Sequence, residues 1–102
     1  MREKTIEQKL VREVKKQGGM CPKFISPGTN GMPDRIVLLP ESHMGFVEVK
    51  APGKKPPPLQ LCRHEQLRKL GYKVSVLDDP DQIPDILAEI REDNDGKNNN
   101  AE

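Results

Sequence analysis

The sequence has few aromatic residues, with two phenylalanines, one tyrosine and no tryptophan. Three rings are too few for the platform on which proteins stack single-stranded bases. It also has only two cysteines, Cys21 and Cys62, and neither belongs to a C-x-x-C pair, which excludes the usual zinc and thioredoxin spacings. We expect both to be small buried thiols in a reducing compartment. His43 and His64 also lack partners at metal-ligand spacing, so we expect structural or surface roles for them.

Long hydrophobic runs are absent. No stretch of about 18 apolar residues occurs, so the sequence predicts no membrane span. The first residues, Met-Arg-Glu-Lys, are charged and lead into an amphipathic stretch, which predicts no signal peptide and an intracellular, cytoplasmic protein. The length of 102 residues fits one domain. We expect that domain to cover residues 1–90, followed by a disordered polar and acidic tail over 91–102.

Overall charge does not identify a partner, because 17 basic residues face 16 acidic ones and the net charge is +1. The distribution of charge is more informative. Between residues 48 and 73 only two side chains are acidic and seven are basic, namely Lys50, Lys54, Lys55, Arg63, Arg68, Lys69 and Lys73. This half of the chain could therefore face phosphate groups.

Hydrophobic spacing predicts a first helix whose buried stripe contains Ile6, Leu10 and Val14. Thr5 and Gln8 form a capping-box pattern that places the helix start at Thr5, and Gly18 and Gly19 end it. Residues 20–25 read as a short edge strand, because Pro22 cannot donate a ladder hydrogen bond. After a polar loop over 26–33, the apolar segments 35–39 and 46–50 are predicted to pair as an antiparallel hairpin.

The second half of the chain begins with a proline-rich loop over 51–58. A helix over 59–70 follows, in which Leu59, Cys62, Leu67 and Leu70 recur at helical spacing and Gly71 supplies the C-terminal cap. Residues 72–77 alternate as a strand does, and 83–90 form a last amphipathic helix that tolerates Pro84 in its first turn. The predicted order is α-β-β-β-α-β-α, a three-layer α/β domain with a mixed sheet.

Three charged residues stand where a charge is costly in such a fold. Asp34 opens an apolar strand, and Glu48 interrupts another. Lys50 follows Glu48 by two residues, so strand alternation places both side chains on one face. If the hairpin forms, Asp34 comes beside them. Two carboxylates can hold a hard cation such as Mg²⁺, and a nearby lysine can orient water or stabilise charge on a phosphate.

The same residues have a simpler interpretation. A Glu-x-Lys pair on a strand usually marks a solvated face, and by itself it predicts no chemistry. The preceding Pro33-Asp34 pair, the glycine-containing loop before it and Glu7 on the first helix favour the catalytic interpretation.

Three blocks of the sequence resemble the VRR-NUC family, a branch of the PD-(D/E)xK nuclease superfamily. They are GMPDRIVL (31–38), FVEVKAPGK (46–54) and L-Q-x-x-x-H-x-x-L-x-x-x-G-Y-x-V (59–74). They occur in family order, and the resemblance covers roughly residues 5–77, which is most of the expected folded chain. The resemblance is to the short stand-alone members carried by phages, and it implies a restriction-endonuclease-like αβββαβ core with a mixed central sheet and a C-terminal helix.

The resemblance also implies roles for individual residues. Asp34 and Glu48 match the metal-binding acids, Lys50 the catalytic lysine and Glu7 the acidic residue of the first helix. The backbone carbonyl of Val49 would be a further metal ligand. Gln60 matches the glutamine of the family's second helix, where it would take part in catalysis near the metal. The implied cofactor is Mg²⁺ or Mn²⁺.

The function expected from this resemblance is metal-dependent, structure-selective cleavage of branched or duplex DNA, either as a Holliday-junction resolvase-like enzyme or as a nicking endonuclease. Paired cutting would need two sites and hence a homodimer. If the protein is phage-encoded, it would act in the host cytoplasm. The basic residues expected to contact phosphates are Lys23, Arg35, Lys54, Lys55 and Arg63, although each could equally serve surface solubility.

Two other functions stay open at this point. One is a non-catalytic DNA-binding or assembly module that keeps the nuclease fold. The other is a small structural α/β protein whose acidic side chains are solvated. Arg63 also stands where the family often has an aromatic residue, which could alter packing or add a phosphate contact.

Overall fold

The computed structural model describes residues 1–92. Its elements in chain order are α1 (Glu3–Lys16), β1 (Arg35–Leu39), β2 (His43–Val49), α2 (Pro58–Lys69), β3 (Val74–Leu77), the 3₁₀ turn η1 (Pro80–Gln82) and α3 (Ile83–Ile90). The sheet order is β1-β2-β3, with β1 and β2 antiparallel and β2 and β3 parallel. The predicted α/β class and mixed sheet are therefore confirmed.

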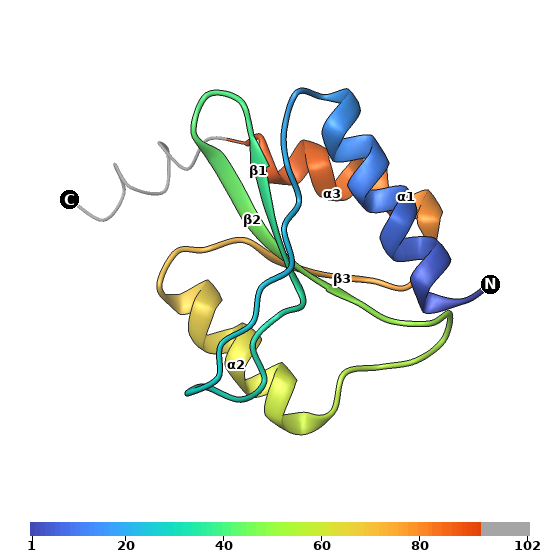
Figure 1. The fold of residues 1–102 in the computed structure, drawn as a ribbon. Coiled ribbons are helices and arrows are strands. Elements are labelled where there is room, and N and C mark those ends of the chain that lie inside the picture. The colour runs from blue at the N-terminus through green and yellow to red at the C-terminus, as the bar shows by residue number, and fades with distance from the viewer. Residues whose placement is uncertain (93–102) are drawn as a thin grey trace.

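The helices cover both faces of the sheet (Figure 1). Helices α1 and α3 contact each other and one face, while α2 packs by β3 on the other. The larger core lies under α1 and α3 and includes Ile6, Leu10, Val37, Val47 and Leu87. The smaller core, under α2, consists of Phe46, Leu67 and Val74, with partly buried neighbours. Alternation along β2 thus separates Val47 from Phe46 and Glu48.

Helix α1 begins two residues earlier than predicted. Its N-cap is Arg2, which makes no side-chain capping bond, and the backbone N–H of Thr5 already donates to the Arg2 carbonyl (3.1 Å). The predicted Thr5 capping box is therefore wrong, because Thr5 lies inside the first turn. The end of the helix is as predicted, since Gly18 follows the last turn with φ +85°.

The predicted strand over 20–25 is present only as an extended edge segment. It runs antiparallel to β1 through two isolated bridges, Met20 with Leu38 and Lys23 with Arg35. The Pro22 carbonyl accepts from the N–H of Ile36 (3.1 Å), but Pro22 has no N–H to return the bond. The ladder is interrupted there, so residues 20–25 are not a regular strand.

The hairpin forms with β1 at its predicted bounds, whereas β2 starts at His43 and ends at Val49. The turn between them places Glu41 (φ +68°) and Ser42 (φ +65°) in the left-handed region, a feature of tight hairpin turns. Strand β3 begins at residue 74, two residues later than predicted. In β2, a Cβ on Gly45 would lie 2.7 Å from Cγ1 of Ile90. This glycine lets α3 approach the sheet closely.

Helix α2 turns a different side toward the sheet than its leucine spacing predicts. Leu59 and Leu70 are exposed, and Cys62 is exposed as well. The buried residues of the helix are His64 and Leu67. With Gln60, these occupy positions i, i+4 and i+7, which define one helical face. A partly polar stripe, and not the leucine-rich one, therefore covers the sheet.

No helix within residues 1–92 is long and apolar enough to cross a membrane. At the C-terminal end, α3 is followed by Arg91 as its cap. Lys73 Nζ donates to the carbonyls of Glu89 (2.7 Å) and Ile90 (3.2 Å), which fixes the end of α3 to the start of β3. The predicted disordered tail lies, from residue 93 onward, outside the described residues, and its disorder stays a prediction.

Candidate active site

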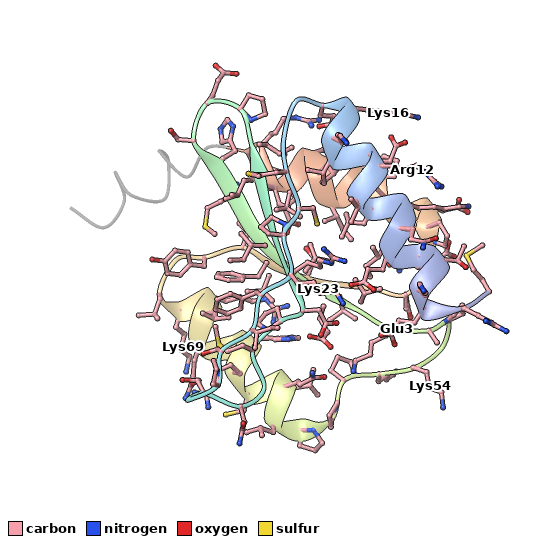
Figure 2. All side chains as sticks on the ribbon, in the orientation of Figure 1. Glu3, Arg12, Lys16, Lys23, Lys54 and Lys69 are labelled. Carbon is pink, nitrogen blue, oxygen red and sulfur yellow. The ribbon has the colours of Figure 1, made fainter. Side chains whose placement is uncertain are left out.

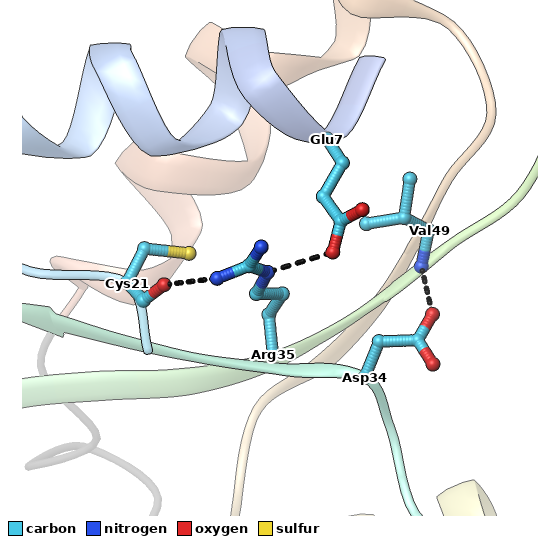
Figure 3. A network of polar contacts seen from close by, with 5 residues as sticks. All are labelled: Glu7, Cys21, Asp34, Arg35 and Val49. Carbon is cyan, nitrogen blue, oxygen red and sulfur yellow. Dashed lines mark hydrogen bonds and ion pairs between the residues drawn. The ribbon is translucent and has the colours of Figure 1, made fainter. Parts of the chain in front are cut away.

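The hairpin register brings Asp34 beside Glu48. Arg35 pairs with Val47 across β1 and β2, so the residue before Arg35 lies next to the residue after Val47. Asp34 Oδ2 accepts a hydrogen bond from the backbone N–H of Val49 at 3.1 Å (Figure 3). This bond fixes the Asp34 carboxylate against β2, as the predicted pairing requires.

Glu48 lies in the central strand, with only 1% of its surface exposed. One carboxylate oxygen, Oε2, is paired with Lys50 Nζ (3.2 Å) and accepts from Gln60 Nε2 (3.0 Å). Oε1, the other oxygen, is buried and has no hydrogen-bond partner among the described residues. The alternative interpretation that Glu48 belongs to a solvated face is therefore wrong.

The surroundings of Glu48 disfavour its charged form. Burial raises the pKa of Glu48 above its ordinary value, and the neighbouring charge of Asp34 raises it further. The ammonium of Lys50 acts in the opposite direction and lowers this pKa. Because burial has the largest effect, further positive charge placed beside Glu48 would favour its ionised form.

Helix α2 adds polar groups to the same place. Within the part of the chain described, four buried side-chain nitrogen and oxygen atoms have no partner: Glu48 Oε1, Gln60 Oε1, and Nδ1 and Nε2 of His64. His64 is fully buried, and burial lowers its pKa, with the charges of Arg68 and Lys50 contributing. Buried polar groups are normally paired, so this concentration of unpaired atoms makes their surroundings the candidate functional site.

His64 was not among the predicted site residues. Its spacing of four from Gln60 was the available signal, because residues at i and i+4 share a helix face. The prediction for this helix relied on the spacing of its leucines and therefore missed this polar pair. Lys50 Nζ, Asp34 and His64 are close enough for the two charges to perturb the imidazole, so His64 borders the acid cluster.

Glu7 does not join this cluster. Its Oε2 is paired with Arg35 Nε at 2.8 Å (Figure 3). Within residues 1–92 there is no group of three histidine, cysteine or acidic side chains that could hold a metal ion. The expected convergence of three carboxylates is therefore not seen within residues 1–92, where Glu7 is paired with the guanidinium of Arg35. A metal-binding role for Glu7 stays a prediction.

The atoms that lack partners fit a hard cation. Glu48 Oε1 and Gln60 Oε1 are both oxygens, and Asp34 lies near enough to Glu48 to raise its pKa. Mg²⁺ and similar ions take oxygen ligands and are commonly held by one or two carboxylates. A divalent cation would also offset the burial and repulsion that now oppose the charge of Glu48.

The predicted phosphate contacts fall into two groups. Arg35 and Arg63 are engaged within the protein: Arg35 Nη1 donates to the Cys21 carbonyl (2.8 Å), and Arg63 Nε donates to the Asn30 carbonyl (3.0 Å). By contrast, Lys23, Lys54 and Lys55 are exposed, and Lys54 extends from the loop after β2 (Figure 2). The positions of these five side chains are compatible with phosphate binding, which stays a prediction for each of them.

The two cysteines differ from each other. Cys21 is buried as predicted, and burial raises the pKa of its thiol to about 11. Cys62 is exposed on α2, contrary to the prediction, because the helix turns Gln60 and His64 inward.

We compared the chain with family models, with curated proteins and with solved structures. No family model matches the sequence. The chain is 54% identical over 81 residues to "Putative nuclease p44" of Acyrthosiphon pisum secondary endosymbiont phage 1, a match covering 79% of this chain and 87% of that protein.

A solved structure described as a "VRR_NUC domain" is 31% identical and superposes with a TM-score of 0.79. The match covers 86% of this chain and 97% of that one. The sequence blocks, the hairpin with its acids and these two similarities lead to the same family: the chain belongs to the VRR-NUC family.

Proposed function

We propose that the protein is a metal-dependent, structure-selective DNA endonuclease. The observation that carries the proposal is the set of buried, unpartnered polar atoms gathered beside the Lys50–Glu48 pair. Leaving such atoms unpaired costs roughly 1–3 kcal/mol for each group. A binding module or a purely structural protein gains nothing from this cost, whereas a site that must accept a cation, water and a phosphate does.

Mg²⁺ or Mn²⁺ would be held by Asp34, Glu48 and the Val49 carbonyl, and when bound would polarise the phosphate and make the attacking water more acidic. Gln60 holds the Glu48 carboxylate through its amide N–H and keeps its own oxygen available to accept from water. Lys50, 21% exposed at its side chain, can reach a phosphate at the site and stabilise the charge that develops on it.

The proposed reaction is hydrolysis of a phosphodiester. The oxygen of a water molecule forms a bond to phosphorus, and the bond from phosphorus to the 3′ oxygen breaks. The water loses a proton to solvent and the 3′ oxygen takes one up, which leaves 5′-phosphate and 3′-hydroxyl ends.

The substrate class follows from the same reasoning. The sequence has only three aromatic residues, and these pack against one another, so recognition would rely on backbone charge and DNA shape. Branched DNA, including four-way junctions, offers such a shape. Symmetrical cutting of two strands would need two active sites and therefore a homodimer, which light scattering of the purified protein can test. The protein would work on DNA in the cytoplasm of the cell that contains it.

The test is cleavage of labelled four-way junctions, flaps and linear duplex in Mg²⁺ and in Mn²⁺. We expect the wild type to cut at least one branched substrate faster than the linear duplex, and EDTA to stop it. Lys50→Ala should lower cleavage by about 10²–10³-fold, as loss of a group that stabilises transition-state charge does, while DNA binding changes little.

Lys15→Ala provides the matched control, because Lys15 is an exposed lysine on α1 away from the acid cluster. It should cleave like the wild type. If DNA binds but no substrate is cut in either metal, the non-catalytic binding module becomes the better description.

A further inference from the structure

A concave site lies between α1 and the start of β1 and is not used by the proposed chemistry. It is a pocket of about 440 Å³ lined by Lys4, Glu7, Gln8, Val11, Arg12, Lys23 and Arg35. Its walls come from α1, from the edge segment over 20–25 and from the start of β1. We call it the basic pocket.

The fold brings these residues together by simple periodicities. Lys4, Gln8 and Arg12 are spaced by four and so share one face of α1. Lys23 pairs with Arg35 across the edge of the sheet, and paired residues of neighbouring strands project to the same side. Figure 2 labels Arg12 on α1 and Lys23 on the edge segment beside that helix. Figure 3 shows Arg35 turned toward Glu7, and Asp34 toward Val49.

Charge in the basic pocket is strongly one-sided. Four of its seven lining side chains are basic, and one is acidic. The acid, Glu7, is already paired with Arg35. Among residues 1–92, no carboxylate lies within ion-pairing distance of Lys4, Arg12 or Lys23. A concave surface with unneutralised charge of one sign concentrates its field, so the lining of the basic pocket is suited to an anion.

The shape and chemistry of the pocket select the kind of anion. It has no aromatic lining residue on which a base could stack, and its one apolar lining residue is Val11. Arg35 is held in place through Nε and Nη1, so its guanidinium plane is fixed. A fixed arginine with flexible basic side chains around it suits the oxygens of a phosphate group.

The geometry points to the basic pocket as a phosphate subsite that holds the DNA backbone away from the scissile bond. Arg35 follows Asp34 directly, so one strand end connects this subsite to the acid cluster. The inference rests on the proposed function, because it makes DNA the source of the phosphate. It adds Lys4 and Arg12 to the DNA contacts that the sequence predicted.

The experiment is a fluorescence-anisotropy titration of a labelled linear duplex with the full chain in EDTA, repeated over a salt series. Each phosphate contact contributes about 0.9 to the slope of log K against log salt. We expect Arg12→Ala and Lys23→Ala each to reduce that slope by about one. Lys9→Ala should leave it unchanged, because Lys9 is on the same helix but outside the basic pocket. Circular dichroism and melting curves confirm that each variant folds.

A second arm identifies the source of the phosphate. Inorganic phosphate, matched to chloride for ionic strength, should compete with the duplex for the wild type and less for Arg12→Ala. If all folded variants keep the wild-type slope, the inference is wrong. The same holds if inorganic phosphate raises the melting temperature through Arg12 while DNA binding is indifferent to Arg12, since the pocket would then serve free phosphate.

Cleavage in Mn²⁺ is measured in parallel to separate this inference from the proposed function. If the slope falls in the pocket variants but the wild type cuts no DNA, the subsite stands and the nuclease proposal fails. If the wild type cuts but the slope is unchanged, only the subsite fails.

Discussion

On one face of the sheet, α1 and α3 enclose a cluster of thirteen buried apolar residues; on the other, α2 covers a cluster of only three, beside a buried glutamate and a buried histidine. The first face can supply most of the hydrophobic stabilisation. The second contains every buried unpartnered side-chain atom found in residues 1–92. The residues that stabilise the fold and the residues of the candidate site therefore lie on opposite faces of the sheet. Because the α1 and α3 face supplies the stability, the α2 face can contain buried polar groups that oppose folding.

Truncation within the larger core should have the greatest effect on folding. Leu10 is fully buried under α1, and Leu10→Ala removes buried methyl groups and leaves a cavity. We expect the free energy of unfolding to fall by about 2–5 kcal/mol, measured by urea denaturation. If the free energy of unfolding fell by less than about 1 kcal/mol, the α1 and α3 face would not be the main source of stability.

Glu48→Gln should act in the opposite direction at neutral pH. The raised pKa of Glu48 means that the folded state holds the proton more tightly than the unfolded state, so ionisation destabilises the fold. The cost is absent well below the ordinary value of 4.5 and grows as pH rises through that value toward the raised one. In EDTA at pH 7 we expect the variant to be more stable than the wild type by about 1 kcal/mol.

The measurement is urea unfolding of wild type and Glu48→Gln at low and neutral pH, with EDTA or Mn²⁺. The two proteins should converge in acid. Mn²⁺ should stabilise the wild type more than the variant, because the ion offsets the burial of a carboxylate. A stability difference that is constant across pH would contradict the assignment of the effect to ionisation of Glu48.

His64→Leu should have the smallest effect on stability. The imidazole is fully buried with both nitrogens unpartnered, and an apolar side chain of similar size removes that cost. We expect the free energy of unfolding to stay within about 1 kcal/mol of wild type or to increase, while cleavage falls. Leu67→Ala on the same helix is the comparison and should destabilise by about 2–4 kcal/mol. Equal losses in both variants would place His64 with the core residues.

Much of this arrangement could be predicted from sequence because it depends on near neighbours. Strand β1 has its predicted bounds, and the hairpin places Asp34 beside Glu48 as alternation requires. Lys50 reaches Glu48 because it follows that residue by two positions, directly after the end of β2. These outcomes follow from local periodicity and one turn.

The errors arose where distant residues compete. Glu7 is paired with Arg35, 28 positions away, and no spacing in α1 reveals that partner. The inward face of α2 was misjudged because leucine spacing suggested burial, whereas the helix turns Gln60 toward Glu48. Residues 20–25 follow β1 but miss one reciprocal bond at Pro22. In each case a contact made only in the folded chain outweighed a local preference.

Two arginines have a consequence for how copies of the chain can associate. Arg35 binds the Cys21 carbonyl on the outer rim of the edge segment, and Arg68 Nη2 binds the Val74 carbonyl (2.9 Å) on the outer rim of β3. Unpaired carbonyls along the edge of a sheet can accept hydrogen bonds from a strand of another molecule. Because one carbonyl on each border is already bonded, pairing of a second molecule along either border is less favourable, which reduces the tendency toward strand-by-strand aggregation.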